Sequence, residues 1–169
     1  SQTNIYEFAM PDIGLMGMRE MVDAARRITA VSSLPIFMDG DTGWGNVLNV
    51  YRSVQEAAWA GVAMMSIEDQ EAPKKSGTSA GRRCVSLEEM VGKIKAAVDA
   101  RDEAESDMLI AARTDIIGGE HGGKIGTLDE AIERCVAFVE AGADVAWINT
   151  PQTFEDMHRA CVEIPGPVI

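Results

Sequence analysis

The sequence is poor in positive charge and has no long apolar run. Its 169 residues include 15 Lys and Arg against 27 Asp and Glu, which gives a formal net charge of −12 at pH 7. Nucleic acids and anionic membrane surfaces attract basic proteins, so this balance argues against both as partners. No apolar stretch approaches the ~18 residues that a membrane-spanning helix needs. An anionic substrate would require a metal ion or local Arg and Lys side chains.

Cysteine and the usual nucleotide-binding loops are also scarce. Cys84, Cys135 and Cys161 lie far apart and lack CxxC spacing, which excludes the common zinc patterns and a disulfide framework. Neither a GxGxxG segment nor a P-loop is present. The first ten residues lack the basic and apolar regions of a signal peptide. We therefore expect a protein of the reducing cytoplasm.

Short apolar runs alternate with segments of helical periodicity along most of the chain. Capping-box patterns, in which Ser or Thr precedes Glu by three residues, mark helix starts at Ser86 and Thr127. Such repeated strand–helix units predict a parallel sheet or barrel. The predicted strands cover residues 34–38, 62–67, 108–112 and 145–148, with a fifth beginning at 167. The predicted helices cover residues 49–60, 86 to about 101, 127 to about 141, and 154–162.

The number of predicted strands bears on the fold class, which is α/β. Four or five strands cannot close a (β/α)8 TIM-type barrel, so we interpret residues 1–169 as one partial domain, an incomplete central portion of such a barrel. An open doubly wound sheet is the alternative, because it also places its site at the ends of its strands. The missing GxGxxG segment makes that alternative less favourable.

Polar side chains gather directly after the predicted strands. Active sites of α/β barrels lie at the carboxyl ends of the strands, so these side chains are the strongest functional signal in the sequence. We expect them to converge on one cleft. They are Asp39, Asp41, Glu68, Asp69, Arg113, Asp115 and Asn149.

Two pairs of acidic residues are candidate metal ligands. Asp39 and Asp41 stand one residue apart before several glycines, a pattern that suits an oxygen-preferring cation such as Mg²⁺. The alternative for this pair is a Gly-rich turn with solvated aspartates. Glu68 and Asp69 would add to the same crowd of carboxylates, which is costly unless a cation neutralises it. The alternative for the second pair is a helix N-cap or a surface pair.

Basic side chains offer two further functional interpretations. Arg113 at a strand end could hold a substrate carboxylate with two parallel hydrogen bonds. Alternatively, Arg113 forms an ion pair with Asp115 or a neighbouring acid. Lys74 and Lys75 lie in a Gly-containing loop and could belong to a lid that closes over an anion. The alternative for this loop is a solvated, disordered segment.

Taken together, five segments resemble the isocitrate lyase/phosphoenolpyruvate mutase superfamily, and most closely its methylisocitrate and dimethylmalate lyases. The similarity covers essentially the whole chain and keeps the order and spacing of the family. It implies a (β/α)8 barrel that exchanges its terminal helix between subunits, and a homotetramer of such dimers. The segments are PDIG at 11–14, DGDTGWGN at 39–46, IEDQ at 67–70, PKKSG at 73–77 and IAARTD at 110–115.

The resemblance also implies roles for several of the polar residues. It implies Mg²⁺ held by Asp39 and Asp41, directly or through water, with Glu68 further from the ion. It implies that Arg113 grips a substrate carboxylate. Asp12 is implied to lie on a loop near the reacting centre.

The loop after residue 72 departs from the lyase pattern. Lyases of the family carry a cysteine that donates a proton, and Ser76 stands at that position, with Thr78 where they have histidine. A serine hydroxyl does not titrate near neutral pH as a thiol can, so Ser76 cannot simply inherit that proton transfer. Asn149 stands where many lyases have glutamate. By the resemblance, Ser76, Gly77 and Asn149 join Arg113 in binding the substrate, and Ser76 joins Asp12 and Arg113 among the catalytic residues.

The predicted function is that of a Mg²⁺-dependent carbon–carbon lyase. The substrate would be a small 2-hydroxy di- or tricarboxylate, cleaved to release pyruvate or glyoxylate through an enolate-like intermediate. Because Ser76 replaces the lyase cysteine, three alternatives remain open. They are a related oxaloacetate decarboxylase or hydrolase, a phosphonopyruvate-type enzyme, and a catalytically impaired homologue.

Overall fold

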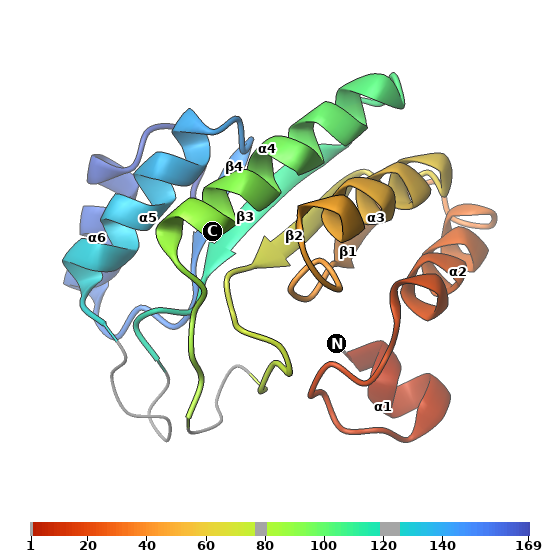
Figure 1. The fold of residues 1–169 in the computed structure, drawn as a ribbon, viewed down its shortest axis with the longest axis horizontal. Helices are drawn as coiled ribbons and strands as arrows, with labels where there is room; N and C mark the ends of the chain where they lie inside the picture. The colour runs from red at the N-terminus through yellow and green to blue at the C-terminus, as the bar shows by residue number, and fades with distance from the viewer. Residues whose placement is uncertain (1, 77–80, 119–125) are drawn as a thin grey trace.

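The computed structural model describes residues 2–76, 81–118 and 126–169 (Figure 1). Within these residues, helices and strands alternate after two initial helices. The helices are α1 (Gln2–Phe8), α2 (Met18–Thr29), α3 (Val47–Trp59), α4 (Leu87–Glu103), α5 (Leu128–Glu140) and α6 (Phe154–Glu163). The strands are β1 (Phe37–Asp39), β2 (Met64–Glu68), β3 (Leu109–Thr114) and β4 (Val145–Ile148).

All four strands run parallel, in the order β1-β2-β3-β4. Val168 forms an isolated parallel bridge to Ala146 of β4, so the predicted fifth strand begins beside β4 as expected. Strands that neighbour each other in sequence therefore neighbour each other in space. This sequential parallel order confirms the α/β prediction and is the order found in the wall of a barrel.

The two faces of the sheet have different surroundings. Met65, Ile67 and Ile110 are fully buried and alternate along their strands with side chains of the opposite face. Helices α3, α4 and α5 lie in a row over one face of the sheet (Figure 1), where these apolar side chains join the hydrophobic core. The other face carries Glu68 and Arg113, which are partners in the register of β2 and β3.

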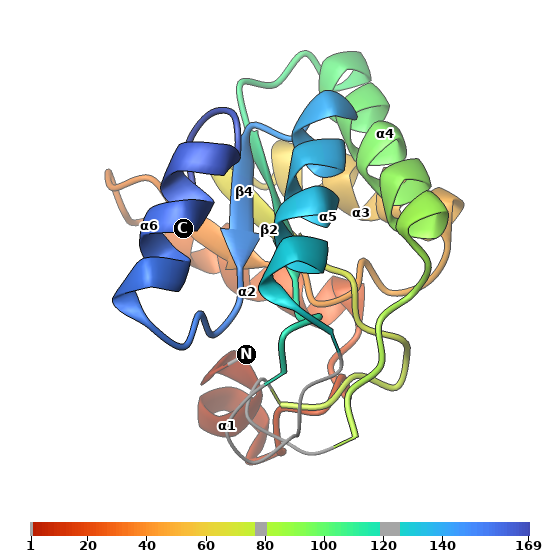
Figure 2. The same ribbon diagram turned by 90° about the vertical axis from the view of Figure 1, so that its left-hand side faces the viewer.

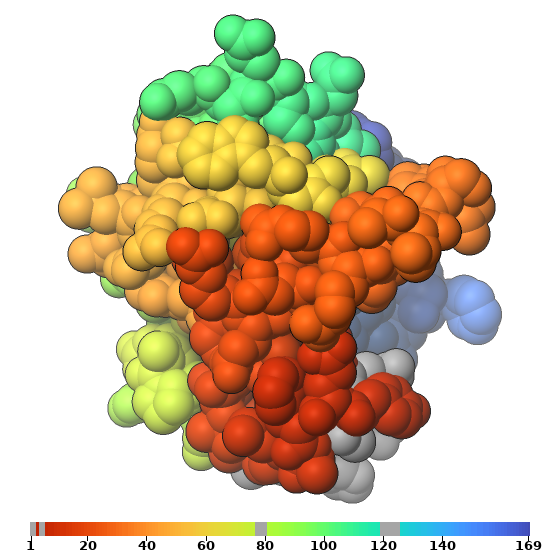
Figure 3. Space-filling view, turned by 90° about the vertical axis from the view of Figure 1, so that its right-hand side faces the viewer, coloured from red at the N-terminus to blue at the C-terminus, as the bar shows by residue number. Residues whose placement is uncertain are grey.

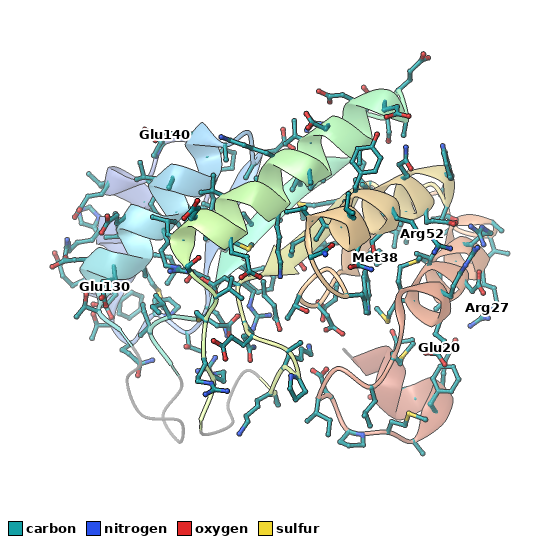
Figure 4. All side chains as sticks on the ribbon, in the orientation of Figure 1. Glu20, Arg27, Met38, Arg52, Glu130 and Glu140 are labelled. Carbon is teal, nitrogen blue, oxygen red and sulfur yellow. The ribbon has the colours of Figure 1, made fainter. Side chains whose placement is uncertain are left out.

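Side-chain caps fix where the covering helices begin. Asn46 caps α3 by accepting hydrogen bonds from the amides of Leu48 and Asn49. Ser86 accepts a hydrogen bond from the amide of Glu89 at the start of α4, as the sequence predicted. Thr127 and Glu130 form the full reciprocal capping box of α5. Figure 4 shows Glu130 and Glu140 at opposite ends of this helix.

The N-terminal helices were not predicted from the sequence. In α2 the buried residues Met21, Val22 and Ala25 form an apolar stripe that helical spacing could have indicated. Helix α1 lies at the same end of the molecule as the loops that follow the strands (Figures 1 and 2). Figure 3 shows this N-terminal segment, in red, covering the lower part of one side beside the loop after β2. The N-terminal segment therefore borders the carboxyl ends of the strands.

Cys84, Cys135 and Cys161 are all free, as expected for a chain without a disulfide framework. None of the helices in the described part of the chain is both long and apolar enough to cross a membrane.

Truncating a core side chain should show how much the sheet–helix interface stabilises the fold. Ile94 of α4 is fully buried, so Ile94→Ala should lower the free energy of unfolding by about 2–5 kcal/mol. Urea unfolding followed by circular dichroism measures this loss. Leu48 of α3 is 75% exposed and provides the control, because Leu48→Ala should change stability far less. Equal losses in both variants would contradict this description of the core.

Candidate active site

One ammonium group lies among three carboxylates at the carboxyl ends of the first strands. The Nζ atom of Lys74 is 3.1 Å from Oδ1 of Asp12 and 3.8 Å from Oε1 of Glu68. It also contacts Oδ1 of Asp41 directly. The side chain of Lys74 is only 5% exposed. Lys74 is therefore a buried counter-ion, which argues against a solvated loop at this position.

Burial and mutual charge perturb the ionisation of this group. Burial raises the pKa of Asp41, and the nearby charge of Asp39 raises it further. Burial raises the pKa of Glu68 to about 8, although the charge of Arg113 acts in the opposite direction. Burial alone would lower the pKa of Lys74, but Glu68 and Asp41 raise it above its ordinary value. The raised pKa values of Asp41 and Glu68 show that the nearby cations do not fully offset the cost of burying these crowded carboxylates away from water.

The backbone after β1 has an unusual conformation that places Asp41. Gly40 leaves no room for a side chain, because a β-carbon there would collide with the carbonyl oxygen of Ser66. Asp41 has φ of 47°, in the left-handed region that non-glycine residues rarely adopt. Its amide donates a hydrogen bond to Oδ1 of Asp39, 3.0 Å away. Strained residues of this kind concentrate at functional sites, which makes Asp41 a candidate for a functional role.

Arg113 connects these carboxylates to a second cluster. Its Nη1 lies 3.2 Å from Oε2 of Glu68, and its Nε lies 2.9 Å from Oδ2 of Asp115. The guanidinium also stacks over the ring of Trp147, 4.9 Å from the ring centroid. Burial would lower the pKa of Arg113, but the charges of Asp115 and Glu68 raise it. The ion-pair alternative from the sequence is thus present, in a geometry that fixes the guanidinium plane.

Asp115 is the centre of the second cluster and is fully buried. Its Oδ1 accepts hydrogen bonds from Nη1 of Arg82 at 2.7 Å and from Nη2 of Arg113 at 2.9 Å. Asn149, which follows β4, donates its side-chain amide to the same oxygen. Arg82 was not identified from the sequence, because nothing in its local pattern shows that the loop turns it inward.

Glu68 and Asp69 do not act as a pair, because they point to opposite faces of the sheet. Asp69 accepts hydrogen bonds from Oγ1 of Thr114 at 2.7 Å and from the amide of Asp115 at 2.9 Å. Its Oδ2 also accepts from Nε of Arg134 on α5, at 2.8 Å. The alternative of a helix cap or surface pair is therefore wrong for both residues. Asp69 joins β2, β3 and α5, while Glu68 faces the clustered charges.

A cavity of about 380 Å³ opens beside Asp41 and Lys74. The N-terminal segment and the loops after β1 and β2 enclose it, with Gly14 and Trp44 in its lining. Nε1 of Trp44 donates a hydrogen bond to the carbonyl oxygen of Met16, 3.1 Å away. The cavity has the dimensions of a small-molecule site and carries charged side chains.

Mg²⁺ usually keeps several water ligands, so one or two protein carboxylates can hold it. In the part of the chain that the structure describes, no three His, Cys, Asp or Glu side chains form a ready metal cage. Asp41 nevertheless has a buried Oδ2 with no hydrogen-bond partner within the described parts of the chain, and its Oδ1 contacts the cation of Lys74. The residues present therefore fit a partly hydrated magnesium ion held by few carboxylates.

The predicted loop residues are only partly placed. Ser76 is partly buried, two residues beyond Lys74, whereas Gly77 and Thr78 lie outside the described residues. Cys84 is the nearest cysteine in sequence. It lies on the returning part of the loop, where its backbone forms an isolated antiparallel β-bridge with Gln70. Burial and then the charge of Asp69 raise the pKa of the Cys84 thiol. This thiol lies beside Asp69, which faces α5 and not the charges clustered around Glu68, so it is no substitute for the missing loop cysteine.

Comparison with known proteins gives the family. Residues 6–169 match the family described as phosphoenolpyruvate phosphomutase. The chain belongs to this family. A 2,3-dimethylmalate lyase of Eubacterium barkeri is 48% identical over 156 residues, covering 92% of this chain and 51% of that protein. A 2-methylisocitrate lyase of Aeropyrum pernix is 40% identical over 161 residues, covering 95% of this chain and 49% of that protein. The chain thus spans about half the length of these curated relatives.

Solved structures of the phosphoenolpyruvate mutase/isocitrate lyase superfamily share the fold. An oxaloacetate acetylhydrolase in complex with 3,3-difluorooxalacetate matches with a TM-score of 0.89 and 30% identity, over 98% of this chain and 55% of that one. A 2,3-dimethylmalate lyase matches with a TM-score of 0.89 and 32% identity, over 98% of this chain and 54% of that one. A phosphonopyruvate hydrolase with oxalate and Mg²⁺ matches with a TM-score of 0.81 and 31% identity, over 99% of this chain and 55% of that one. These relatives confirm the prediction of an incomplete TIM-type barrel.

Asp69 should be essential for stability. Replacing it by Ala leaves Arg134 buried without its partner, so Asp69→Ala should destabilise the protein by about 3–5 kcal/mol. The measurement is the midpoint and slope of urea unfolding. Glu71 pairs with Arg83 at the surface, and Glu71→Gln should produce no measurable change. A small effect of Asp69→Ala would show that the buried network does not hold the sheet to α5.

Proposed function

We propose that this protein is a Mg²⁺-dependent carbon–carbon lyase. Its substrate is a 2-hydroxy di- or tricarboxylate, and it releases an α-oxo acid, pyruvate or glyoxylate, through an enolate-like intermediate. The observation that carries the proposal is the position of Glu68. Its two carboxylate oxygens face Lys74 and Arg113, so the candidate metal ligands and the candidate carboxylate-binding arginine belong to one site.

Asp39 and Asp41 are the proposed residues for Mg²⁺, with Glu68 further out. The buried, unpaired Oδ2 of Asp41 supports this assignment. When bound, Mg²⁺ supplies a Lewis acid that stabilises negative charge developing on the oxygens of the α-oxo acid. A homologous phosphonopyruvate hydrolase is known with Mg²⁺ and oxalate, which is consistent with the same cofactor here.

The side chains of this site bind and orient the substrate. Arg113 is proposed to hold the substrate carboxylate, and its contacts with Asp115 and Trp147 orient the guanidinium before the substrate arrives. Asn149 donates to Asp115 and presents an amide at the same strand end. Gly77, which lies outside the described residues, is proposed from the family resemblance to bind the substrate as well.

Cleavage moves one proton from oxygen to carbon. The 2-hydroxyl group loses its proton as the carbon–carbon bond breaks, and the electron pair of that bond remains on the departing fragment. Asp12, held against Lys74, is proposed to accept the hydroxyl proton. Ser76 is proposed to protonate the departing carbon, because it stands where lyases of the family carry the proton-donating cysteine. Because a serine hydroxyl is a weaker acid than a thiol, this second transfer limits the rate.

Hydrolytic cleavage of oxaloacetate is the second candidate. Ser76 favours it, since the loop has no thiol at the position where lyases of the family carry cysteine. The structural similarity to an oxaloacetate acetylhydrolase is consistent with it.

The protein is further proposed to act in the cytoplasm as a homotetramer of helix-exchanged dimers, in line with its three free cysteines and its family.

Asp41 should be required for Mg²⁺ binding. In the wild type, Mg²⁺ with oxalate should raise the melting temperature, because a ligand that binds only the folded state stabilises it. Asp41→Asn removes the charge and should weaken Mg²⁺ binding by about tenfold or more, a loss of about 1.4 kcal/mol. Isothermal titration calorimetry measures the affinity. Asp102→Asn, at an exposed aspartate of α4, is the control, and equal affinities in both variants would reject the metal site.

The identity of residue 76 should decide the rate of lyase chemistry. Ser76→Cys introduces an acid that titrates nearer neutral pH, and it should raise turnover by about 10²-fold, the lower range for acid catalysis. The assay measures pyruvate and glyoxylate released from a panel of 2-hydroxy di- and tricarboxylates, with Ser76→Ala as the control. If neither the wild type nor Ser76→Cys released pyruvate or glyoxylate from any of these acids, the lyase assignment would be rejected. Acetate and oxalate formed from oxaloacetate by the wild type would favour the second candidate.

A further inference from the structure

The cluster around Asp115 contains two guanidinium groups, those of Arg82 and Arg113, for the one carboxylate of Asp115. Oδ1 of Asp115 accepts from Arg82 and Arg113 as well as from Asn149. Since two guanidinium groups donate to one oxygen atom, they must lie side by side. Glu68 provides a second carboxylate to Arg113, whereas Asp115 is the acid that pairs with Arg82 among the described residues.

Arg82 itself is held in an unusual state. Its side chain is 1% exposed, and its Nη1 donates a hydrogen bond to Asp115 at 2.7 Å. Nε and Nη2 are buried and have no hydrogen-bond partner among the residues that the structure describes. These two atoms form one edge of the guanidinium fork, the edge that matches both oxygens of a carboxylate. Arg82 therefore presents a bidentate anion-binding edge next to the arginine already proposed to bind substrate.

The neighbouring arginine shows that this placement is specific to Arg82. Arg83 is 79% exposed at its side chain and pairs with Glu71 at the surface of the loop. Arg82 instead turns inward to reach Asp115, which directly follows β3 and lies 33 residues away in the chain. If Arg82 only anchored the loop to Asp115, the Nη1 contact would be sufficient. Such an anchoring role does not explain why Nε and Nη2 are buried without a partner among the described residues.

We propose that Arg82 binds the second carboxylate of the substrate, while Arg113 binds the carboxylate next to the reacting carbon. The pair of guanidinium groups makes the site selective for di- and tricarboxylates over monocarboxylates. This inference rests on the proposed function, in which the site accepts an organic acid. Arg82 is thus a specificity-determining residue that touches the substrate at the end remote from the reaction.

Malate and lactate test this directly, because both carry a 2-hydroxy acid end and only malate has a second carboxylate. Calorimetric titrations of the full chain with Mg²⁺ give the dissociation constant of each acid. Arg82→Gln should weaken malate binding by about tenfold or more and change lactate binding less than about twofold, since a charge-assisted pair is lost for malate alone. Arg113→Gln should weaken both acids.

Two further variants guard the interpretation. Arg83→Gln alters the exposed neighbour and should leave the malate-to-lactate affinity ratio unchanged. Arg82→Lys keeps a point charge without the fork, so it should give an intermediate ratio even if Arg82→Gln folds poorly. A wild-type ratio in Arg82→Lys and Arg82→Gln, or an equal loss for both acids, would overturn the proposal and reduce Arg82 to a support for Asp115. A wild type that binds neither acid with Mg²⁺ would refute the proposed function, and this inference with it.

Discussion

The arrangement of the site depends on one buried ammonium group. Lys74 meets carboxylates from the N-terminal segment, from the loop after β1 and from the end of β2. In a poorly solvated position these acids would repel each other without a cation between them. A hard divalent cation meets the same requirement, which is why this charge distribution suits Mg²⁺ as well as lysine. The proposed chemistry thus follows from an excess of buried negative charge at the strand ends.

A second cluster balances the first with opposite sign. Arg113 lies between them, bound to Glu68 on one side and to Asp115 on the other. Arg82 adds positive charge to Asp115 from the returning loop. The site therefore has an acidic side suited to a cation and a basic side suited to carboxylates. In a complex of Mg²⁺ with an organic acid, the metal ion would face the acidic side and the carboxylates of the acid would face the basic side.

Most of the elements could be predicted because their signals are local. The caps at Ser86 and Thr127 and the short apolar runs lie within a few residues of the structures they specify. Helix α2 was missed although its buried stripe was readable, because its polar face dominates the sequence. Asp39 and Arg113 could be selected from the sequence as candidate site residues because parallel strands bring their carboxyl ends to one edge.

By itself, the sequence determined the alternating α/β plan, the polar strand ends and the family likeness, since each is written in neighbouring residues. Only the tertiary structure decided that Glu68 faces the site while Asp69 faces α5. It also decided that Lys74 and Arg82 point inward from a loop. Loop side chains take their direction from contacts with residues distant in sequence, and no local periodicity encodes those contacts.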